Sequence, residues 1–381
     1  MMLTNADVVD LTGFRRALHR RPEVSGAERE TAAAVVDFLA PTAPDLVLTG
    51  LGGHGVALVF DGVADGPTVM IRSELDALPI HELTGLDYQS ETPGTAHLCG
   101  HDGHSAILAG VARVLARRRP ARGRAVLLFQ PAEEDGSGAA AVLADPAFAA
   151  IAPDYAFALH NLPGLPLGKV VLQPGPANCA SRGMKIVLTG KTSHAAQPDA
   201  GISPALAVAR LIPGLMALGP GGELSDDFRL VTVTHARMGE PAFGITPGEA
   251  QVWATLRTVR DDRMAALVAG AEALARAEGQ GGLKVSISYH DIFAACTNDP
   301  GATALMAAAL QAEGIAQIAG TMPLRASEDF GRFGAGAKAA MFYLGAGEAS
   351  PALHNPDYDF PDALIPLGTR AFLRVIRDLL G

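Results

Sequence analysis

The segment from residue 97 to residue 104 contains three histidines, a cysteine and an aspartate, in the order His-Leu-Cys-Gly-His-Asp-Gly-His. Thiolate and neutral imidazole are preferred ligands of borderline metals such as zinc. Cys99 and His101 are two positions apart, and Gly100 between them permits a tight turn that directs both side chains to one point. The segment therefore predicts a metal site. A buried free cysteine beside polar helix-capping residues would show the same pattern.

A predicted helix follows this segment. Residues 104–118 have apolar side chains at helical spacing, so the cluster is expected on a loop at the start of a helix. The dipole of that helix would favour the ionised form of the Cys99 thiol.

Further polar side chains follow predicted strands. Residues 68–72, 125–129 and 155–159 are short apolar runs, typical of strands covered on both faces. The side chains that come after these runs are Glu74, Asp76, Glu133, Glu134 and His160. Ligands of open α/β sheets bind beyond the carboxyl ends of the strands. Helix-terminal charges and a hydrogen-bonded core histidine could explain each residue alone, but not their shared position.

The remaining pattern predicts an α/β fold with an open mixed sheet flanked by helices. Helices are expected at 7–20, 26–40, 104–118, 136–144, 300–313 and 362–380, and strands at 46–49, 56–60, 68–72, 125–129, 155–159 and 341–345. The glycine cluster at 50–55 precedes a strand, whereas a dinucleotide-binding fingerprint requires a helix there. We therefore predict a hairpin turn at these glycines.

The middle of the chain has a different character. From about residue 181 the pattern is β-α-β-β-α-β, the order of a ferredoxin-like α+β module. We therefore predict a catalytic domain formed by residues 1–178 and 291–381, interrupted by an inserted lid and dimerisation domain at 179–290.

Composition excludes several classes of function. The 381 residues include 30 Lys and Arg against 40 Asp and Glu, a net charge of −10, which argues against nucleic acid or an anionic membrane as partner. The three cysteines are far apart and indicate no disulfide framework. Neither a signal-peptide pattern nor an apolar run of ~18 residues is present. A cytoplasmic protein is expected.

Eight motifs occur in order along nearly the whole chain, at residues 15–23, 72–79, 97–104, 130–134, 160–161, 190–196, 327–330 and 353–360. On these motifs the chain resembles the metal-dependent amidohydrolases that include hippurate hydrolase, N-acyl-amino-acid hydrolases and auxin-conjugate hydrolases. These enzymes are a branch of the aminoacylase and glutamate-carboxypeptidase-like metallopeptidases.

The resemblance implies two divalent metal ions per subunit. The implied ligands are Cys99, as a bridging thiolate, with His101, Glu134, His160 and His354. Glu133 corresponds to the general base, and Asp76 to a carboxylate that orients a neighbouring group. Glu74 stands where relatives have Asp or a ligating His, so its role stays open.

The inserted domain supplies two further residues by the same resemblance. His194 corresponds to a histidine that stabilises the oxyanion, often in the active site of the neighbouring subunit. Relatives have an Asn-x-Ile-Pro motif that helps to hold the substrate, but here the motif is 244–247, Gly-Ile-Thr-Pro. Arg257 matches a family arginine, and we predict that it holds the substrate carboxylate. Alternatively, Arg257 merely occupies an edge strand.

These features predict an enzyme that hydrolyses the amide bond of N-acyl or N-aroyl amino acids, or alternatively of dipeptides and short peptides. A non-catalytic scaffold is disfavoured because every ligand-type position is filled. A structural zinc protein would instead use paired Cys motifs. Zinc or manganese is expected, with cobalt or nickel as alternatives. A homodimer is expected, with a tetramer as the alternative.

Overall fold

The computed structural model describes residues 2–381, which form two compact units. Unit 1 comprises the residues up to Ala177 together with Thr297–Met322 and Asp329–Gly381. Unit 2 comprises Asn178–Cys296 and Pro323–Glu328. Unit 2 therefore extends beyond the predicted 179–290, because its last strand continues to Phe293 and a later segment returns to it.

Unit 1 contains a seven-stranded mixed sheet within the described residues, in the order β1-β2-β4-β3-β5-β15-β6. Its strands are β1 (Leu46–Leu51), β2 (Gly55–Asp61), β3 (Ala64–Glu74), β4 (Arg122–Gln130), β5 (Tyr155–Pro163), β6 (Val170–Val171) and β15 (Lys338–Gly347). The four central strands β4, β3, β5 and β15 are parallel, and β1, β2 and β6 run antiparallel to their neighbours. The turn at the glycine cluster joins β1 and β2 in a hairpin, as predicted.

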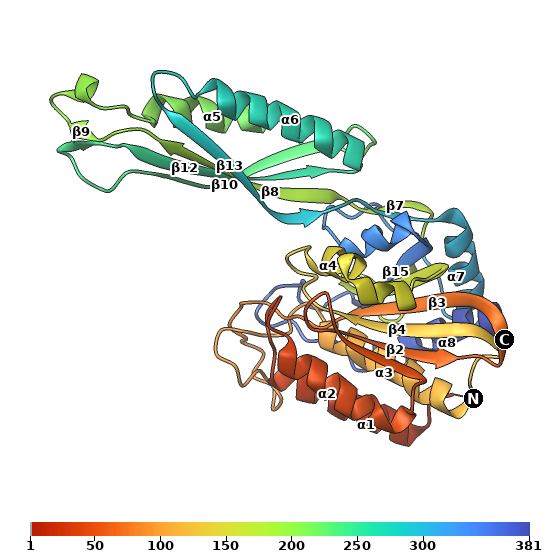
Figure 1. The fold of residues 1–381 in the computed structure, drawn as a ribbon. Coiled ribbons are helices and arrows are strands. Elements are labelled where there is room, and N and C mark those ends of the chain that lie inside the picture. Colours follow the sequence, from red (N-terminus) through yellow and green to blue (C-terminus); the bar gives the residue numbers. More distant parts are fainter. Residues whose placement is uncertain (1) are drawn as a thin grey trace. The chain divides into compact units, whose positions relative to one another are not determined.

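Helices cover both faces of this sheet (Figure 1). They are α1 (Asn5–Arg20), α2 (Arg29–Leu39), α3 (His101–Arg117), α4 (Gly138–Ala144), α7 (Pro300–Ala312) and α8 (Leu364–Leu380). In β4, Ala125, Leu127 and Phe129 join the core with α3 and α8, whereas Val126 and Leu128 are buried on the opposite face. Burial on both faces explains why this strand is a continuous apolar run. The predicted fold class is confirmed.

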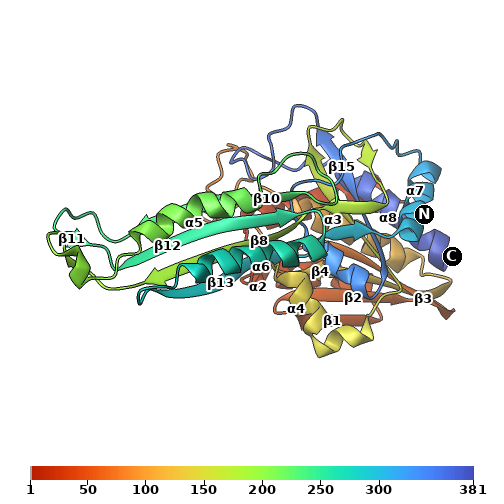
Figure 2. The same cartoon turned by 90° about the horizontal axis from the view of Figure 1, so that it is seen from above.

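Unit 2 is an α+β module with a four-stranded antiparallel sheet in the order β10-β12-β8-β13. Its elements are β8 (Ala180–Thr189), α5 (Ala205–Leu218), β10 (Arg229–Met238), β12 (Glu249–Thr258), α6 (Asp261–Ala277) and β13 (Lys284–Phe293). Figure 2 shows α5 and α6 on the same face of the sheet. Alternate residues of β8, such as Met184, Ile186 and Leu188, pack beneath these helices. This is the predicted ferredoxin-like arrangement.

Short elements complete the chain. They are β7 (Gly175–Asn178), β9 (Ser193–His194), β11 (Ile245–Thr246), β14 (Cys296–Asn298) and four 3-10 segments at 40–42, 146–150, 198–200 and 329–335. In unit 2, β9 pairs with β11. No helix in residues 2–381 has the length and apolar character needed to cross a membrane.

Candidate metal centre

The turn before α3 directs Cys99 and His101 toward one point. Gly100 has a φ of 94°, a left-handed conformation that favours glycine, and a Cβ at this position would collide with the side chain of Asn161. Helix α3 begins at His101, three residues earlier than predicted, because Gly100 occupies the N-cap position. His101 therefore lies in the first turn of the helix and Cys99 in the loop before it.

All five predicted metal ligands belong to unit 1 and are brought together. Their donor atoms form two sets, in each of which the atoms lie within 4.8 Å of one another. One set contains Cys99, His101 and His160, and the other contains Cys99, Glu134 and His354. Cys99 is therefore common to both sets, as a bridging thiolate would be.

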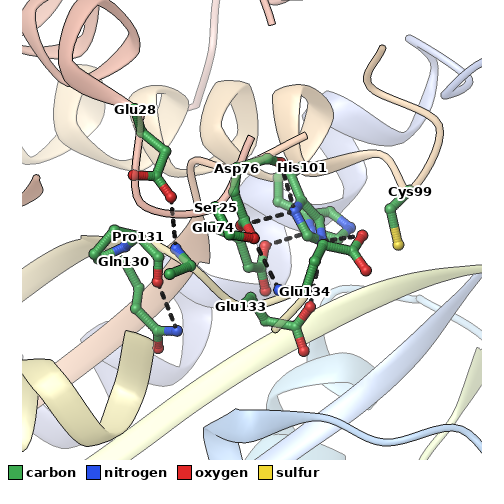
Figure 3. A network of polar contacts seen from close by, with 12 residues as sticks. Ser25, Glu28, Glu74, Asp76, Cys99, His101, Gln130, Pro131, Glu133 and Glu134 are labelled. Carbon is green, nitrogen blue, oxygen red and sulfur yellow. Dashed lines mark hydrogen bonds and ion pairs between the residues drawn. The ribbon is translucent and has the colours of Figure 1, made fainter. Parts of the chain in front are cut away.

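Asp76 orients two of these residues (Figure 3). His101 donates from Nδ1 to the Asp76 backbone oxygen at 2.9 Å, and Asp76 Oδ1 lies 3.3 Å from the same nitrogen. Asp76 Oδ2 accepts a hydrogen bond from the backbone N–H of Glu134 at 2.9 Å. These contacts direct His101 Nε2 toward the cluster, and such support from behind a ligand is typical of metal sites.

The other two ligands are oriented by backbone contacts. His160 lies within β5, which continues past the predicted end at residue 159 because β15 pairs with it through Pro163. It donates from Nδ1 to the Asn161 backbone oxygen at 2.7 Å, which leaves Nε2 3.4 Å from the Cys99 sulfur. His354 has a φ of 67° and donates its backbone N–H to the oxygen of Leu98 at 2.8 Å. A non-glycine residue in this conformation is strained, and such strain clusters at functional sites.

The electrostatics of the cluster favour cations. Burial, together with the carboxylates of Glu134 and Glu133, raises the pKa of the Cys99 thiol well above its usual value. Burial and the two carboxylates thus act against the helix dipole, which is expected to favour the thiolate. Burial acts to lower the pKa of His101, but the hydrogen bond with Asp76 and nearby carboxylates raise it to about 10. A bound cation would displace both protons.

The donor atoms of this cluster suit divalent metal cations. His101 Nε2 and Glu134 Oε1 are buried and 3.9 Å apart, and neither has a hydrogen-bond partner among the described residues. Buried polar atoms are normally hydrogen-bonded, so two facing atoms without partners indicate a ligand between them. Thiol, imidazole and carboxylate together are the donor set of zinc and related divalent metals. Burial lowers the pKa of His160 to about 3, which keeps this ligand neutral.

Glu133 lies beside the ligands. It is buried, and its Oε2 is 3.9 Å from His101 Nε2. Figure 3 shows the Glu133 and Glu134 side chains next to each other at the loop that follows Pro131. This position is suitable for proton transfer near the metal ligands.

Glu74 has a different environment from Asp76. It is fully buried, forms an ion pair with Arg72, and accepts a hydrogen bond from His104 Nδ1 at 2.6 Å. Its donor atoms lie close to those of His101 and His104. Because Arg72 and His104 already contact the carboxylate, this geometry favours a supporting role for Glu74.

A second buried network lies behind the metal ligands. Arg15 of α1 forms ion pairs with Asp102 and with Asp359, and His19 lies 2.8 Å from Asp102. Sequence reasoning did not assign these residues. The motif at 15–23 was the available signal, but it gave no indication that Arg15 and His19 would be fully buried.

The two candidate residues of unit 2 lie on its strands. His194 is exposed in β9, and its Nδ1 accepts a hydrogen bond from the backbone N–H of Ala196 at 3.1 Å. Arg257 lies in β12, an interior strand, which excludes the edge-strand alternative. It donates to the backbone oxygen of Arg325 and to Ser327 Oγ.

Known proteins are similar to this chain over most of its length. Residues 70–378 match the profile of peptidase family M20/M25/M40. N-acetyl-L-cysteine deacetylase of Bacillus subtilis is 34% identical over 325 residues, covering 84% of this chain and 76% of that protein. N-acetyldiaminopimelate deacetylase of Exiguobacterium sibiricum is 29% identical, covering 93% and 95%. The solved structure of Bacillus subtilis YXEP, described as a dinuclear metal-binding peptidase of the M20 family, has a TM-score of 0.82 and 26% identity, covering 99% of each chain.

The chain belongs to peptidase family M20/M25/M40, which confirms the resemblance found in the sequence. It is a hydrolase that acts on amide bonds.

Proposed function

We propose that this protein hydrolyses the amide bond of N-acyl amino acids with two divalent metal ions. The observation that supports this most directly is the pair of donor sets that share Cys99, with Glu133 beside them. Deacetylase relatives, named for N-acetylcysteine and N-acetyldiaminopimelate, support an N-acyl amino acid as substrate.

Five residues of unit 1 would hold the ions. They are Cys99, His101, Glu134, His160 and His354. When bound, the ions would lower the pKa of a water molecule and polarise the amide carbonyl. Zinc and manganese both suit this mixture of ligands, with cobalt and nickel as alternatives.

Glu133 is the general base of the proposed reaction. Its carboxylate accepts a proton from the attacking water and then donates that proton to the departing nitrogen. Asp76 holds His101 and the backbone of Glu134, so it keeps the ligands beside Glu133 in place while the proton moves.

His194 is proposed to stabilise the negative charge that develops on the carbonyl oxygen. The hydrogen bond that its Nδ1 accepts from Ala196 places the proton of the neutral ring on Nε2. An exposed Nε2–H is a donor suited to an oxyanion.

Arg257 is proposed to bind the carboxylate of the amino-acid part of the substrate. Its contacts with Arg325 and Ser327 hold one nitrogen of the guanidinium in place. Burial lowers the pKa of Arg257, although this side chain stays protonated in any case. A guanidinium of fixed orientation can bind a carboxylate through two parallel hydrogen bonds.

We also propose a homodimer formed through unit 2. Strand β10 lies at the edge of the unit 2 sheet, and an edge strand offers backbone groups for pairing with a second chain. Light scattering of the purified protein would show a monomer if this is wrong.

The deciding experiment is a substrate screen on metal-stripped protein. N-acetyl amino acids, N-benzoyl amino acids and dipeptides are each tested with zinc, manganese or cobalt restored. Turnover of N-acyl amino acids that requires added metal supports the proposal. Preference for dipeptides would instead indicate a dipeptidase, and full activity of verified metal-free protein would contradict the metal assignment.

A further inference from the structure

Glu28 is a fully buried carboxyl group that the proposed reaction does not use. It immediately precedes α2, where an acidic side chain would ordinarily cap the helix in contact with solvent, yet it makes no capping hydrogen bond. Glu23 does this instead, because its carboxylate accepts hydrogen bonds from the backbone N–H and the hydroxyl of Thr31. Glu28 therefore does not cap α2.

The Glu28 carboxylate is directed at the loop after β4 (Figure 3). Its Oε1 accepts hydrogen bonds from the backbone N–H groups of Gly26 and Ala132, both at 2.8 Å. Its Oε2 is buried and has no hydrogen-bond partner among the described residues. Burying a carboxyl group costs free energy, and burial raises the pKa of Glu28. A cost of this kind is typical of a group retained for a function other than stability.

The residue that Glu28 holds has an unusual backbone conformation. Ala132 has a φ of 51°, in the left-handed region that non-glycine residues seldom adopt. Glu133 and Glu134 follow it directly, so the direction of both side chains depends on this turn. The same N-terminal segment is also linked to the loop indirectly, through Asp76. Ser25 donates to the Asp76 oxygen that accepts the hydrogen bond from the Glu134 backbone N–H.

We infer that Glu28 is a positioning residue that holds Ala132 in its left-handed conformation and thereby fixes Glu133 and Glu134 relative to the other metal ligands. The contact spans distant parts of the sequence, from the turn before α2 to the loop after β4. The effect on metal binding stands without the proposed function, whereas the effect on turnover rests on it.

The test compares three variants of the full-length protein. Glu28→Ala removes the acceptor for the Ala132 N–H. Glu28→Gln keeps an acceptor oxygen and is the conservative variant. Glu23→Gln is the matched control, because it alters a carboxylate of the same turn that binds α2 and has no hydrogen bond to residues 130–134.

Two of the measurements do not depend on activity. Hydrogen exchange of a peptide covering residues 130–138 is measured by mass spectrometry. Titration of metal-free protein with Co²⁺, followed by the thiolate-to-cobalt absorption of Cys99, gives the metal affinity. The third measurement is kcat and KM on an N-acetyl amino acid.

For Glu28→Ala we expect faster exchange at 130–138, Co²⁺ affinity about 10-fold lower, and kcat about 10-fold lower with KM changed less than about twofold. Glu28→Gln should recover much of each loss. Glu23→Gln should leave all three unchanged even if the protein melts earlier. If wild type hydrolyses no N-acyl amino acid, the proposed function fails, but exchange and Co²⁺ binding still test Glu28.

Two results would overturn the inference. One is a Glu28→Ala protein with wild-type exchange and Co²⁺ affinity, and the other is a Glu23→Gln protein with the same losses. Should Glu28→Ala not fold, the same measurements on Glu28→Asp decide, because the shorter side chain keeps the carboxyl group but withdraws its oxygen from the Ala132 N–H. Wild-type exchange and Co²⁺ affinity in Glu28→Asp would overturn the inference.

Discussion

The two units of this protein differ in the burial of their ion pairs. Unit 1 contains completely buried ion pairs in addition to exposed ones, whereas the ion pairs described in unit 2 include exposed side chains. Unit 1 has buried contacts between charged or titratable side chains, and almost none of their surface is exposed. The contacts are Arg15 with Asp102, Arg72 with Glu74, and Asp76 with His101. In unit 2, ion pairs such as Arg210–Glu278 lie at the surface, and His194 is exposed. The candidate metal ligands His101 and Glu134 are thus held in place by buried contacts, whereas the candidate residue His194 is exposed.

This difference indicates where changes should be costly. A buried charge that loses its partner retains the full penalty of desolvation, whereas an exposed charge regains water. Substitutions in unit 1 should therefore affect both stability and chemistry. Substitution of the exposed His194 in unit 2 should affect chemistry alone.

The largest effect is expected at Glu133. Glu133→Gln should lower kcat by about 10²–10⁴-fold with metal retained, because the base is lost and the ligands are intact. Glu134→Gln should lower metal content as well, which elemental analysis measures. Equal metal loss in both variants would show that the two glutamates share their roles.

Breaking the buried ion pairs of Arg15 should come next. Arg15→Met should lower the stability of unit 1 by about 3–5 kcal/mol, because Asp102 stays buried without this partner. Hydrogen exchange of peptides from each unit measures the change. Arg210→Met, at an exposed ion pair, is the control and should alter hydrogen exchange in neither unit. If Arg210→Met lowers the stability of unit 2 as much as Arg15→Met lowers that of unit 1, the contrast between the units is wrong.

His194→Ala should lower transition-state stabilisation by roughly 2–4 kcal/mol without changing metal content or melting temperature. Mixing it with Glu133→Gln subunits tests where the histidine acts. Recovery of activity after verified subunit exchange means that it acts in the partner's site. A variant with wild-type kcat would exclude His194 from the reaction.

A smaller effect is expected at Arg257. Arg257→Ala should reduce the preference for an N-acyl amino acid over its amide on the order of 10-fold, because one charge-assisted contact is lost. The ratio of kcat/KM for the two substrates measures this preference. If the ratio does not change, Arg257 does not bind the carboxylate.

The last expected effect is a dependence of stability on pH, which His19 should cause. Burial acts to lower its pKa, but the hydrogen bonds with Asp102 and Glu82 raise it to about 9, above the value of about 6.5 in an unfolded chain. The resulting stabilisation is complete below pH 6.5 and is lost as pH rises through about 9. Urea unfolding between pH 6 and 10 should show this decline in wild type and a flatter profile in His19→Gln, and parallel profiles would contradict it.

Much of this site was predictable from the sequence, since strand-end positions and motif spacing identify Cys99, His101, Glu134 and their neighbours. The raised pKa of the Cys99 thiol could not be predicted, because it depends on carboxylates that approach from another loop. The burial of Glu28 could not be predicted either, because a glutamate before a helix has the same sequence pattern whether it caps the helix or is buried. The Cys99 pKa and the burial of Glu28 both depend on contacts between distant segments, which the local sequence pattern does not indicate.

The pairing of β5 with β15 has a consequence for biosynthesis. In the sequence, most of unit 2 lies between these adjacent parallel strands. While the ribosome produces that intervening segment, the apolar edge of β5 has no neighbour, and His354 has not yet been added to the metal ligands. An unpaired apolar edge invites aggregation. The nascent chain therefore has an interval in which unit 2 can fold while the edge of β5 that pairs with β15 is still open.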